Sequence, residues 1–517
     1  MVSNRIPALR HTRHWWHLSR SSHWSPLAGR LSPPASTRQP IRRLAAVCTV
    51  GAALAFSLIG GPALARTTID IGIGTQNTTT NTVTGGVVIQ QMKLLEKYLP
   101  HDGKYRDVDY HIDWQNFTSG PPVTNGMMAG KLQIGMMGDY PLVVNGATGQ
   151  QLKGNETELI AVLGYNAYGA GNGVVVNKQS PYYSLADLKG KTVSVPFGSA
   201  AHGMLLQAMQ KQGWSSDYLR LANQSPEVGT TNLQENKIDA HADFVPFPEL
   251  LPFRGFARKV YDGVENRTPT FHGVVVRKDF AQQYPEIVVA YLRALIDANA
   301  WLRANPQQAA TDIQQWTHIE KEVVYIFLGP NGIHTLDPTI KPVEHDALKT
   351  AYGVLQSMNR VKDFNIDAWV NDSYLRTAFK LDGLDYDAQL RSLANYEIRG
   401  TDPVCKTSID HPAEAAEIWI AGGAIVPVSS ASCALTGIKQ YRAQGKKIDV
   451  VYVMDHSLGI KLFADQAFYV ATPAAGASGQ TSITPFLLKA DAKRYADAQH
   501  GRLMTYEDAL AASPDRR

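Results

Sequence analysis

The feature that most constrains the fold is a short strand that runs through a glycine and a serine into a helix. Residues 192–195 alternate between polar and apolar side chains, as in a strand. Residues 198–206 begin with Gly-Ser-Ala-Ala and continue with a pattern typical of an amphipathic helix. Because the first amides of a helix lack partners within it, backbone N–H groups gather after the strand. The block predicts an α/β protein with an anion site at this point.

Strands and helices alternate on both sides of this block. Residues 69–73 and 108–114 have the alternation of half-buried strands, and residues 88–99 have helical spacing between them. A short strand at 133–137 ends at Gly138 and Asp139, and a long amphipathic helix is predicted after Pro285. This order favours doubly wound α/β units, in which ligands bind at the carboxyl ends of strands.

Two valine-rich segments, residues 173–178 and 273–278, are nearly identical. We interpret them as short buried strands and as the two crossings between lobes, which places lobe two at about residues 177–272. A chance repeat is the alternative. The predicted fold class is α/β, with two doubly wound lobes and a hinge over residues 66–395, followed by a small α+β domain over residues 400–517.

Residues 1–65 have the composition of an export signal. They contain eight arginines but no Asp, Glu or Lys, and an apolar run at 44–59 precedes Ala63-Leu64-Ala65. We predict a signal peptide cleaved before about Arg66 and a periplasmic mature protein. A retained membrane anchor is the alternative, and Sec and Tat export both remain open. Without these arginines the chain has 42 basic and 46 acidic residues, so no nucleic-acid partner is expected.

Several motifs in combination resemble those of the periplasmic substrate-binding proteins for alkanesulfonates, taurine and nitrate (the SsuA/TauA/NitT family). They are DLKGK at 187–191, GSAAH at 198–202, a glutamine after the first strand, Ser-Gly-Pro at 119–121 and Gly-Asp at 138–139. The resemblance covers residues 67–385. It implies a periplasmic-binding-protein fold and a monomer without cofactor or enzymatic activity. The implied partners are a small anionic or zwitterionic solute and the permease subunits of an ABC importer.

The resemblance also implies a ligand site contributed by both lobes. A sulfonate or nitrate is a poor proton acceptor, so neutral donors and a helix dipole suffice to hold it. For Asp139 a turn cap or a contact with a cationic ligand group is expected, His202 either donates or packs, and the turn glycines could be purely conformational. The predicted ligand-binding residues are Gln76, Thr78, Ser119, Gly138, Asp139, Gly198, Ser199, Ala200, His202 and Asp243, and no catalytic or metal-binding residue is predicted.

One segment departs from the family's pattern. Relatives often have DAW-x-x-WDP where this chain has His241, Phe244 and Val245 in place of the two tryptophans and the last aspartate. The organic half of the ligand is therefore left open by the sequence.

The C-terminal residues resemble a second family, the copper-handling accessory lipoproteins of nitrous oxide reductase (NosL-like). The similar motifs are DPVC at 402–405, VYVMD at 451–455 and HGRLMTYED at 500–508. We expect a helix at 413–419, strands at 424–428 and 450–453, a loop at 471–482 and a helix at 491–500.

In that second family a Cys and a Met bind Cu(I) as soft donors. Here Thr407 stands where a Met is usual, and residues 482–484 lack the other expected Met. Two outcomes remain open. One is a Cys405–Cys433 disulfide without copper, and the other is a remodelled site using Cys405, Cys433, Met454 or His456.

Two other functions remain as alternatives to solute binding. The first is an enzyme on the same fold, like the related thiamine-pyrimidine synthases. Those need a histidine and a cysteine-rich iron motif, and no cysteine lies between Arg66 and Val404. The second is a periplasmic copper-handling protein that acts through its C-terminal domain.

Overall fold

The computed structural model describes residues 66–393, 395–473 and 481–514. The predicted signal peptide, residues 1–65, lies outside these ranges, so its cleavage stays a prediction. None of the described helices is both long and apolar enough to cross a membrane.

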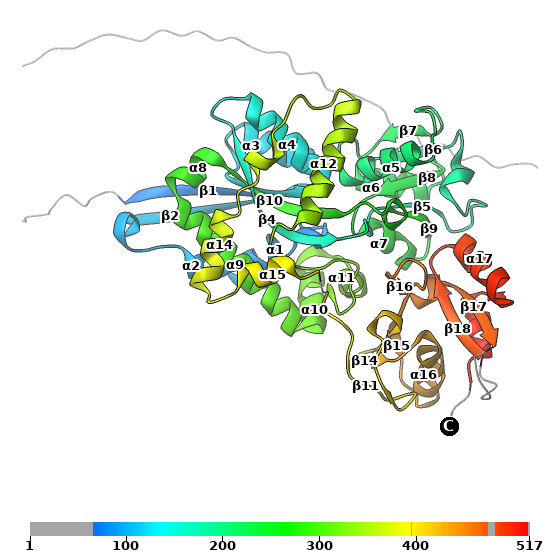
Figure 1. Ribbon diagram of the computed structural model, residues 1–517. Helices are drawn as coiled ribbons and strands as arrows, with labels where there is room; N and C mark the ends of the chain where they lie inside the picture. The colour runs from blue at the N-terminus through cyan, green and yellow to red at the C-terminus, as the bar shows by residue number, and fades with distance from the viewer. Residues whose placement is uncertain (1–65, 394, 474–480, 515–517) are drawn as a thin grey trace, which may run out of the picture. The chain divides into compact units, whose positions relative to one another are not determined.

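A mixed five-stranded sheet forms the centre of the first lobe (Figure 1). It has the order β2-β1-β3-β10-β4, with β1 parallel to β2 and β3 and with β10 antiparallel to β3 and β4. The isoleucines at 69, 71 and 73 are buried, as their alternation predicts. The strands are β1 (Thr67–Thr75), β2 (Val108–Asn116), β3 (Ile134–Gly138), β4 (Thr157–Asn166) and β10 (Thr270–Arg277).

The second lobe repeats this arrangement with its own sheet, in the order β7-β6-β8-β5-β9. Here β6 is parallel to β7 and β8, and β5 is antiparallel to β8 and β9. The prediction of two α/β lobes is confirmed. The strands are β5 (Gly173–Asn177), β6 (Thr192–Val195), β7 (Arg220–Asn223), β8 (Ala240–Asp243) and β9 (Ala257–Asp262).

Helices cover both faces of the first sheet. One hydrophobic cluster joins the sheet to α3, α4 and α12, and another joins it to α1, α9 and α14. The helices of this lobe are α1 (Val87–Met92), α2 (Leu94–Tyr98), α3 (Gly120–Met128), α4 (Asp139–Gln151), α8 (Lys278–Gln283), α9 (Pro285–Ala304), α10 (Pro306–Thr317), α11 (Lys321–Leu328), α12 (Pro342–Ser357), α13 (Ile366–Trp369), α14 (Ser373–Leu381) and α15 (Tyr386–Arg391). Those of lobe two are α5 (Ala200–Lys211), α6 (Pro226–Gln234) and α7 (Phe247–Phe253).

The helix predicted over residues 88–99 is two helices. Lys93 adopts a left-handed conformation with φ of 53°, which ends α1 and starts α2 in a new direction. The spacing of apolar residues continues from α1 into α2, so the sequence pattern does not reveal the break between the two helices.

The valine-rich segments are strands, but they are not the crossings between lobes. Residues 173–177 form β5 inside the second sheet, and residues 273–277 belong to β10 inside the first. The chain crosses just before each of them, at residues 167–172 and 263–269. Gly169 and Gly171 have φ of +98° and +108° in the first crossing, a conformation that favours glycine.

The C-terminal residues form a separate set of antiparallel sheets, in the orders β14-β13-β15-β16, β18-β17-β19 and β11-β12. This confirms the strands at 424–428 and 450–453 and the helix at 491–500. The elements are β11 (Thr401–Asp402), β12 (Thr407–Ser408), β13 (Ala416–Ile420), β14 (Ile425–Val428), α16 (Ala431–Ala443), β15 (Ile448–Met454), β16 (Lys461–Phe463), β17 (Phe468–Pro473), β18 (Thr481–Phe486), α17 (Lys489–Gln499), β19 (Arg502–Met504) and α18 (Tyr506–Ala512).

Two predictions for this region need correction. Residues 413–419 are not a helix, because after a short turn at Pro412–Glu414 they form β13, which pairs with β14 and β15. The mostly apolar segment at residues 415–420, which contains Glu417, is compatible with either a helix or a strand, and pairing on both sides decides for a strand. Both ends of the segment predicted as a loop at 471–482 are strands, because β17 extends to Pro473 and β18 begins at Thr481, and residues 474–480 lie outside the described residues.

Cys405 and Cys433 form a disulfide with a Cα–Cα distance of 5.8 Å. Asp402 lies beside it, and the three side chains place potential metal-binding atoms within 4.8 Å of one another. However, the Asp402 carboxylate already accepts hydrogen bonds from the amides of residues 404, 405 and 429 and from the Ser429 hydroxyl. With both sulfurs bonded to each other and this carboxylate saturated, the residues do not fit a copper ion.

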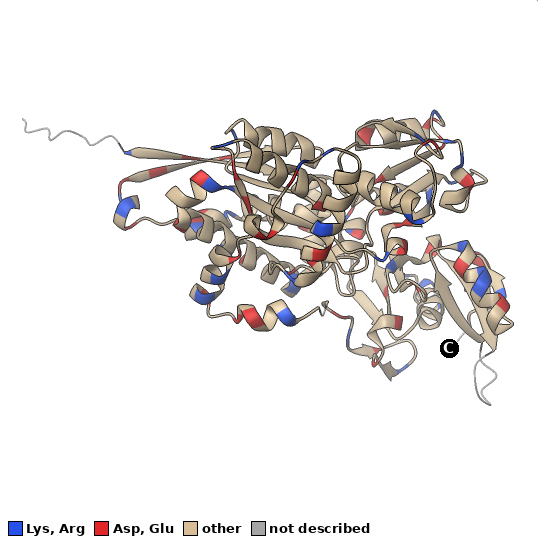
Figure 2. Cartoon of the chain, turned by 45° about the horizontal axis from the view of Figure 1, so that its top comes forward, with Lys and Arg blue, Asp and Glu red and all other residues tan. Residues whose placement is uncertain are grey.

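Acidic and basic residues are interspersed along the described chain (Figure 2). In α17, for example, three basic and two acidic side chains share eleven residues. The absence of a nucleic-acid partner stays a prediction.

A buried ion pair within the C-terminal domain is hydrogen-bonded to the first lobe. Lys461 of β16 lies 2.5 Å from Glu417 of β13, and both side chains are almost fully buried. The Lys461 ammonium also donates to the carbonyl of Pro330, and Tyr325 of α11 donates to the other oxygen of Glu417 at 2.8 Å. Burial lowers the pKa of Lys461, and Glu417 opposes this shift.

The same domain also contacts lobe two. The ring of Phe463 lies 5.1 Å from that of Phe253 in α7. Phe468 lies 6.4 Å from Tyr183, and the Lys489 ammonium lies 4.3 Å from the centre of the Tyr183 ring. The C-terminal domain therefore bridges both lobes.

Removing the charge of Glu417 should destabilise the protein strongly. Glu417→Gln leaves the Lys461 ammonium buried without a counter-charge, which costs about 3–5 kcal/mol of unfolding free energy. Adding Lys461→Met should restore part of this loss. The control is Asp387→Asn in the exposed Arg376–Asp387 pair, expected to cost about 1 kcal/mol or less. Urea unfolding measures all of these, and a Glu417→Gln cost as small as the control's would contradict the prediction.

Candidate functional site

A cavity of about 300 Å³ lies between the two lobes. Lobe one contributes residues from the beginning of α3, from α4 and from the end of α12, and lobe two contributes the loop after β6 and the beginning of α5. The lining residues are Pro121, Thr124, Tyr140, Pro141, Val144, Phe197, Gly198, Ser199, His202, Leu206, Leu355, Met358 and Arg360.

The helix N-terminus predicted from the sequence forms one wall of this cavity. Gly198 has φ of +81°, which turns the chain from β6 into α5. Ser199 is the N-cap of α5, and its hydroxyl oxygen accepts a hydrogen bond from the amide of His202 at 3.2 Å. The amides of Ala200 and Ala201 are the other donors of the first turn. The cavity thus meets the positive end of a helix dipole.

His202 is held as a neutral side chain. Its ring stacks on Phe197 with centroids 4.6 Å apart, and its Nδ1 accepts a hydrogen bond from the Gly198 amide at 3.2 Å. Burial, with a smaller effect from Arg360, lowers the pKa of His202 to about 4. At neutral pH the single ring proton is therefore on Nε2, which makes this atom a hydrogen-bond donor.

The lobes contact each other beside the cavity through α4 and α5. The Tyr140 ring lies directly against Gly203, where a Cβ atom would be 2.1 Å from the ring. Gln207 donates to the Tyr140 hydroxyl at 2.6 Å. Only glycine at position 203 allows this approach of the two lobes.

Asp139 is directed toward its own lobe. Its carboxylate accepts hydrogen bonds from the Tyr140 amide and from the Thr270 hydroxyl, each at 2.8 Å. Burial raises its pKa to about 6, although these hydrogen bonds oppose the shift. Asp139 and Ala200 line a small adjacent cavity of about 20 Å³ at the crossings. The contacts match the turn cap expected for this residue.

The structure brings Gly198, Ser199 and His202 together in the large cavity, and none of the other predicted residues lines it. Gly138 lies against Ala200 across the lobes, since a Cβ at 138 would be 3.2 Å from that of Ala200. Gln76 is buried and donates to the carbonyl of Met136 at 2.8 Å. Thr78 and Ser119 are half-buried and do not line the cavity.

The loop after β1 is buried although it is polar. The hydroxyls of Thr79, Thr80 and Thr84 and the side-chain oxygen of Asn81 have no partner within the described residues. Buried polar atoms normally have a hydrogen-bond partner. This loop therefore offers hydrogen-bonding capacity on the side of lobe one.

Asp243 lies outside the cavity in a buried chain of polar side chains. Its carboxylate is 2.8 Å from Nε2 of His241, and Nδ1 of His241 is 2.6 Å from the Ser194 hydroxyl. All three side chains are at most 1% exposed. The order resembles a hydrolase triad, but a solute cannot reach the serine, and the chain links β6 to β8 instead.

Of the thirteen residues that line the cavity, the sequence predicted Gly198, Ser199 and His202 and missed the other ten. Tyr140, Phe197 and Arg360 are among those missed. Phe197 is 39% exposed in the structure, which is a large fraction for a phenylalanine. Its position directly before Gly198 could have identified it from the sequence as a residue beside the predicted anion site. Arg360 comes from a segment more than 150 residues away from Ser199, and no motif marks it.

Part of the chain, residues 159–309, is similar to a known protein family. The family described as NMT1/THI5 like matches residues 159–309, which include all of lobe two. Residues 159–309 are therefore similar to this family.

Similar curated proteins carry names of binding proteins. The taurine-binding periplasmic protein of Escherichia coli is 33% identical over 38% of this chain and 58% of its own length, less than two thirds of that relative. The putative aliphatic sulfonates-binding protein of Escherichia coli is 24% identical over 55% of this chain and 83% of its own length.

Solved structures were also found. The alkanesulfonate-binding protein SsuA of Xanthomonas axonopodis bound to MOPS has a TM-score of 0.49 and 20% identity over 58% of this chain and 98% of its own. The nitrate-binding protein NrtA of Synechocystis has a TM-score of 0.47 and 14% identity over 63% of this chain and 91% of its own.

A side chain at position 203 should separate the two lobes. In Gly203→Ala the new methyl group collides with the Tyr140 ring, although alanine favours the helix itself by about 1 kcal/mol. We expect a larger radius of gyration by small-angle scattering. Gly353→Ala in α12, where no atom lies within 4 Å of the new methyl group, is the control and should leave the radius unchanged. Equal radii for the two variants would contradict the close contact.

Proposed function

We propose that this protein is the solute-binding component of an ABC importer and captures a small oxyanion-bearing compound between its lobes. The observation that carries the proposal is the helix N-terminus at Ser199 in the wall of an interlobe cavity of about 300 Å³. The names of two relatives, a taurine-binding periplasmic protein and a putative aliphatic sulfonates-binding protein, support it.

The proposed contacts come from both lobes. Gly198, Ser199 and Ala200 offer backbone amides and a hydroxyl to the oxyanion, and His202 adds a neutral N–H donor. From lobe one, we propose that the buried polar loop at residues 76–84, whose hydroxyls lack partners within the described residues, supplies further donors. Ligand binding then favours the closed arrangement of the lobes, because only that arrangement brings both sets of donors together.

The remaining parts of the proposal concern the cell and the partner. We propose that the leader is removed before about Arg66, that the mature protein works in the periplasm and that it delivers its solute to membrane permease subunits. The relatives' names as periplasmic binding proteins support this location. We propose no catalytic step, since the one serine–histidine–aspartate chain in the described lobes is sealed from the cavity.

A negative charge at the helix N-terminus tests the proposal. Ser199→Asp keeps a good N-cap, so α5 should stay folded, but it places a carboxylate against the bound oxyanion. Two like charges about 4 Å apart repel by about 4 kcal/mol near a protein surface, so affinity should fall about 100-fold or more. Calorimetry with ethanesulfonate, taurine and nitrate measures this loss.

The control is the same substitution at another N-cap. Ser225 caps α6 through the Val228 amide and does not line the cavity, so Ser225→Asp should bind like the parent. Equal affinities of the two variants would reject the helix N-terminus as the anion site. If the parent binds none of the three compounds, the proposed function is rejected.

A further inference from the structure

The cavity between the lobes has an uneven distribution of charge. Arg360 is its one charged lining residue, and none of the lining residues is an aspartate or a glutamate. The other polar groups of the wall are neutral hydroxyls, amides and the His202 ring. A ligand in this cavity therefore meets positive but no negative charge.

The backbone holds Arg360 in a defined place. Asn359 has φ of +54° and ends α12, and the amides of residues 359 and 360 donate to the carbonyls of residues 356 and 355 at 2.9 Å each. This is the hydrogen-bond pattern of a Schellman motif, which closes a helix rigidly. Arg360 is exposed, and within the described residues no hydrogen bond or ion pair joins its guanidinium to another side chain. Its positive charge contributes to the lowered pKa of His202.

The rest of the wall is apolar. Val144 of α4, Leu206 of α5 and Leu355 and Met358 of α12 line the cavity together with the exposed ring of Phe197. Nitrate would fill only a small part of about 300 Å³ and would contact none of this surface efficiently. An ammonium group such as that of taurine would lose its hydration without finding a carboxylate.

We propose, on the basis of the function proposed above, that the solute is an anion with an apolar tail and that Arg360 binds its anionic end. The guanidinium and the N-terminus of α5 hold the charged group, and the aliphatic and aromatic wall holds the tail. The site discriminates against zwitterions by lacking a counter-charge for the cation.

A pair of ligands of equal size tests the apolar tail. Propane-1-sulfonate and taurine differ by a methyl group in place of an ammonium group. We expect the full-length mature chain to bind propane-1-sulfonate at least tenfold more tightly than taurine. Each added methylene from ethanesulfonate to hexanesulfonate should tighten binding about fourfold until the cavity is full.

A neutral ligand and two variants test Arg360. Arg360→Gln should weaken propane-1-sulfonate about tenfold or more and should leave neutral propane-1-sulfonamide within twofold of the parent. Arg360→Lys should recover part of the loss, because it restores the charge without the planar fork. Arg220→Gln, an equal charge change on the exposed strand β7, is the matched control and should change neither ligand's affinity.

The outcomes separate this inference from the proposed function. Binding of taurine as tight as that of propane-1-sulfonate overturns the apolar tail, and equal effects of Arg360→Gln and Arg220→Gln overturn the role of Arg360. In both cases oxyanion binding itself still stands. If the parent binds none of the sulfonates or nitrate, the proposed function falls and the inference falls with it.

Discussion

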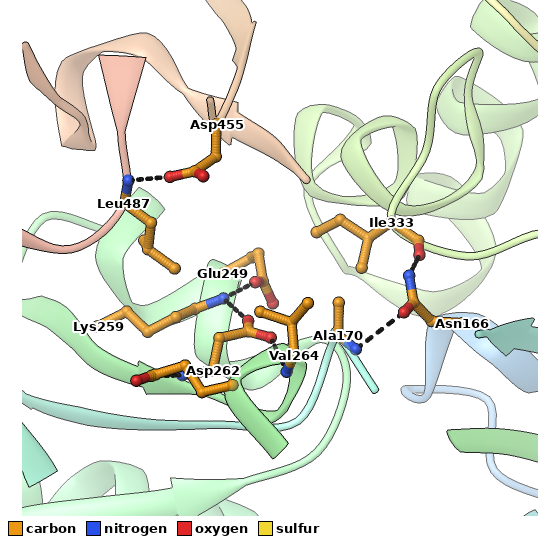
Figure 3. Close-up of polar contacts among 10 residues, drawn as sticks. Asn166, Ala170, Glu249, Lys259, Asp262, Val264, Ile333, Asp455 and Leu487 are labelled. Carbon is orange, nitrogen blue, oxygen red and sulfur yellow. Dashed lines mark hydrogen bonds and ion pairs between the residues drawn. The ribbon is translucent and has the colours of Figure 1, made fainter. Parts of the chain in front are cut away.

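The close contact between the two crossing segments determines how the lobes can meet. A Cβ at Gly169 would lie 2.3 Å from the carbonyl oxygen of Thr268, and one at Gly263 would lie 2.3 Å from that of Gly169. Asp262 enters the second crossing while bound to the buried Lys259 at 2.7 Å, and Glu249 contacts the same ammonium (Figure 3). Burial alone would lower the pKa of Lys259, but the carboxylates of Asp262 and Glu249 raise it, so the ammonium stays charged. The ion pair therefore fixes Asp262 at the start of the second crossing.

Local patterns in the sequence were sufficient to predict the two lobes and one wall of the cavity. The alternation at residues 69–73 and the strand followed by Gly198 and Ser199 depend on neighbours in the chain, and the structure contains both as predicted. Arg360 could not be found in this way. Its place in the cavity depends on how α12 packs against α4 and α5, which no local pattern encodes.

The incorrect predictions have a common physical origin. Residues 173–178 and 273–278 were correctly predicted as buried strands, but burial alone does not tell a strand inside one sheet from a crossing between two sheets. Residues 413–419 form a strand because β14 and β15 pair with them, an interaction between residues distant in sequence. Asp243 is the last residue of β8, and its side chain is turned inward to His241 rather than toward the cavity, which the sequence does not show.

The C-terminal domain has a mechanical consequence, because it bridges both lobes. Its contacts through Tyr325 and Glu417 on one lobe and through Phe253 and Phe463 on the other close a ring of three bodies. If the two lobes were joined only by the crossing segments, these segments alone would limit the angle between the lobes. In a ring, any rotation must also slide an aromatic interface or strain the Lys461 anchor. Relative movement of the lobes is therefore constrained partly by residues that lie outside the cavity between them.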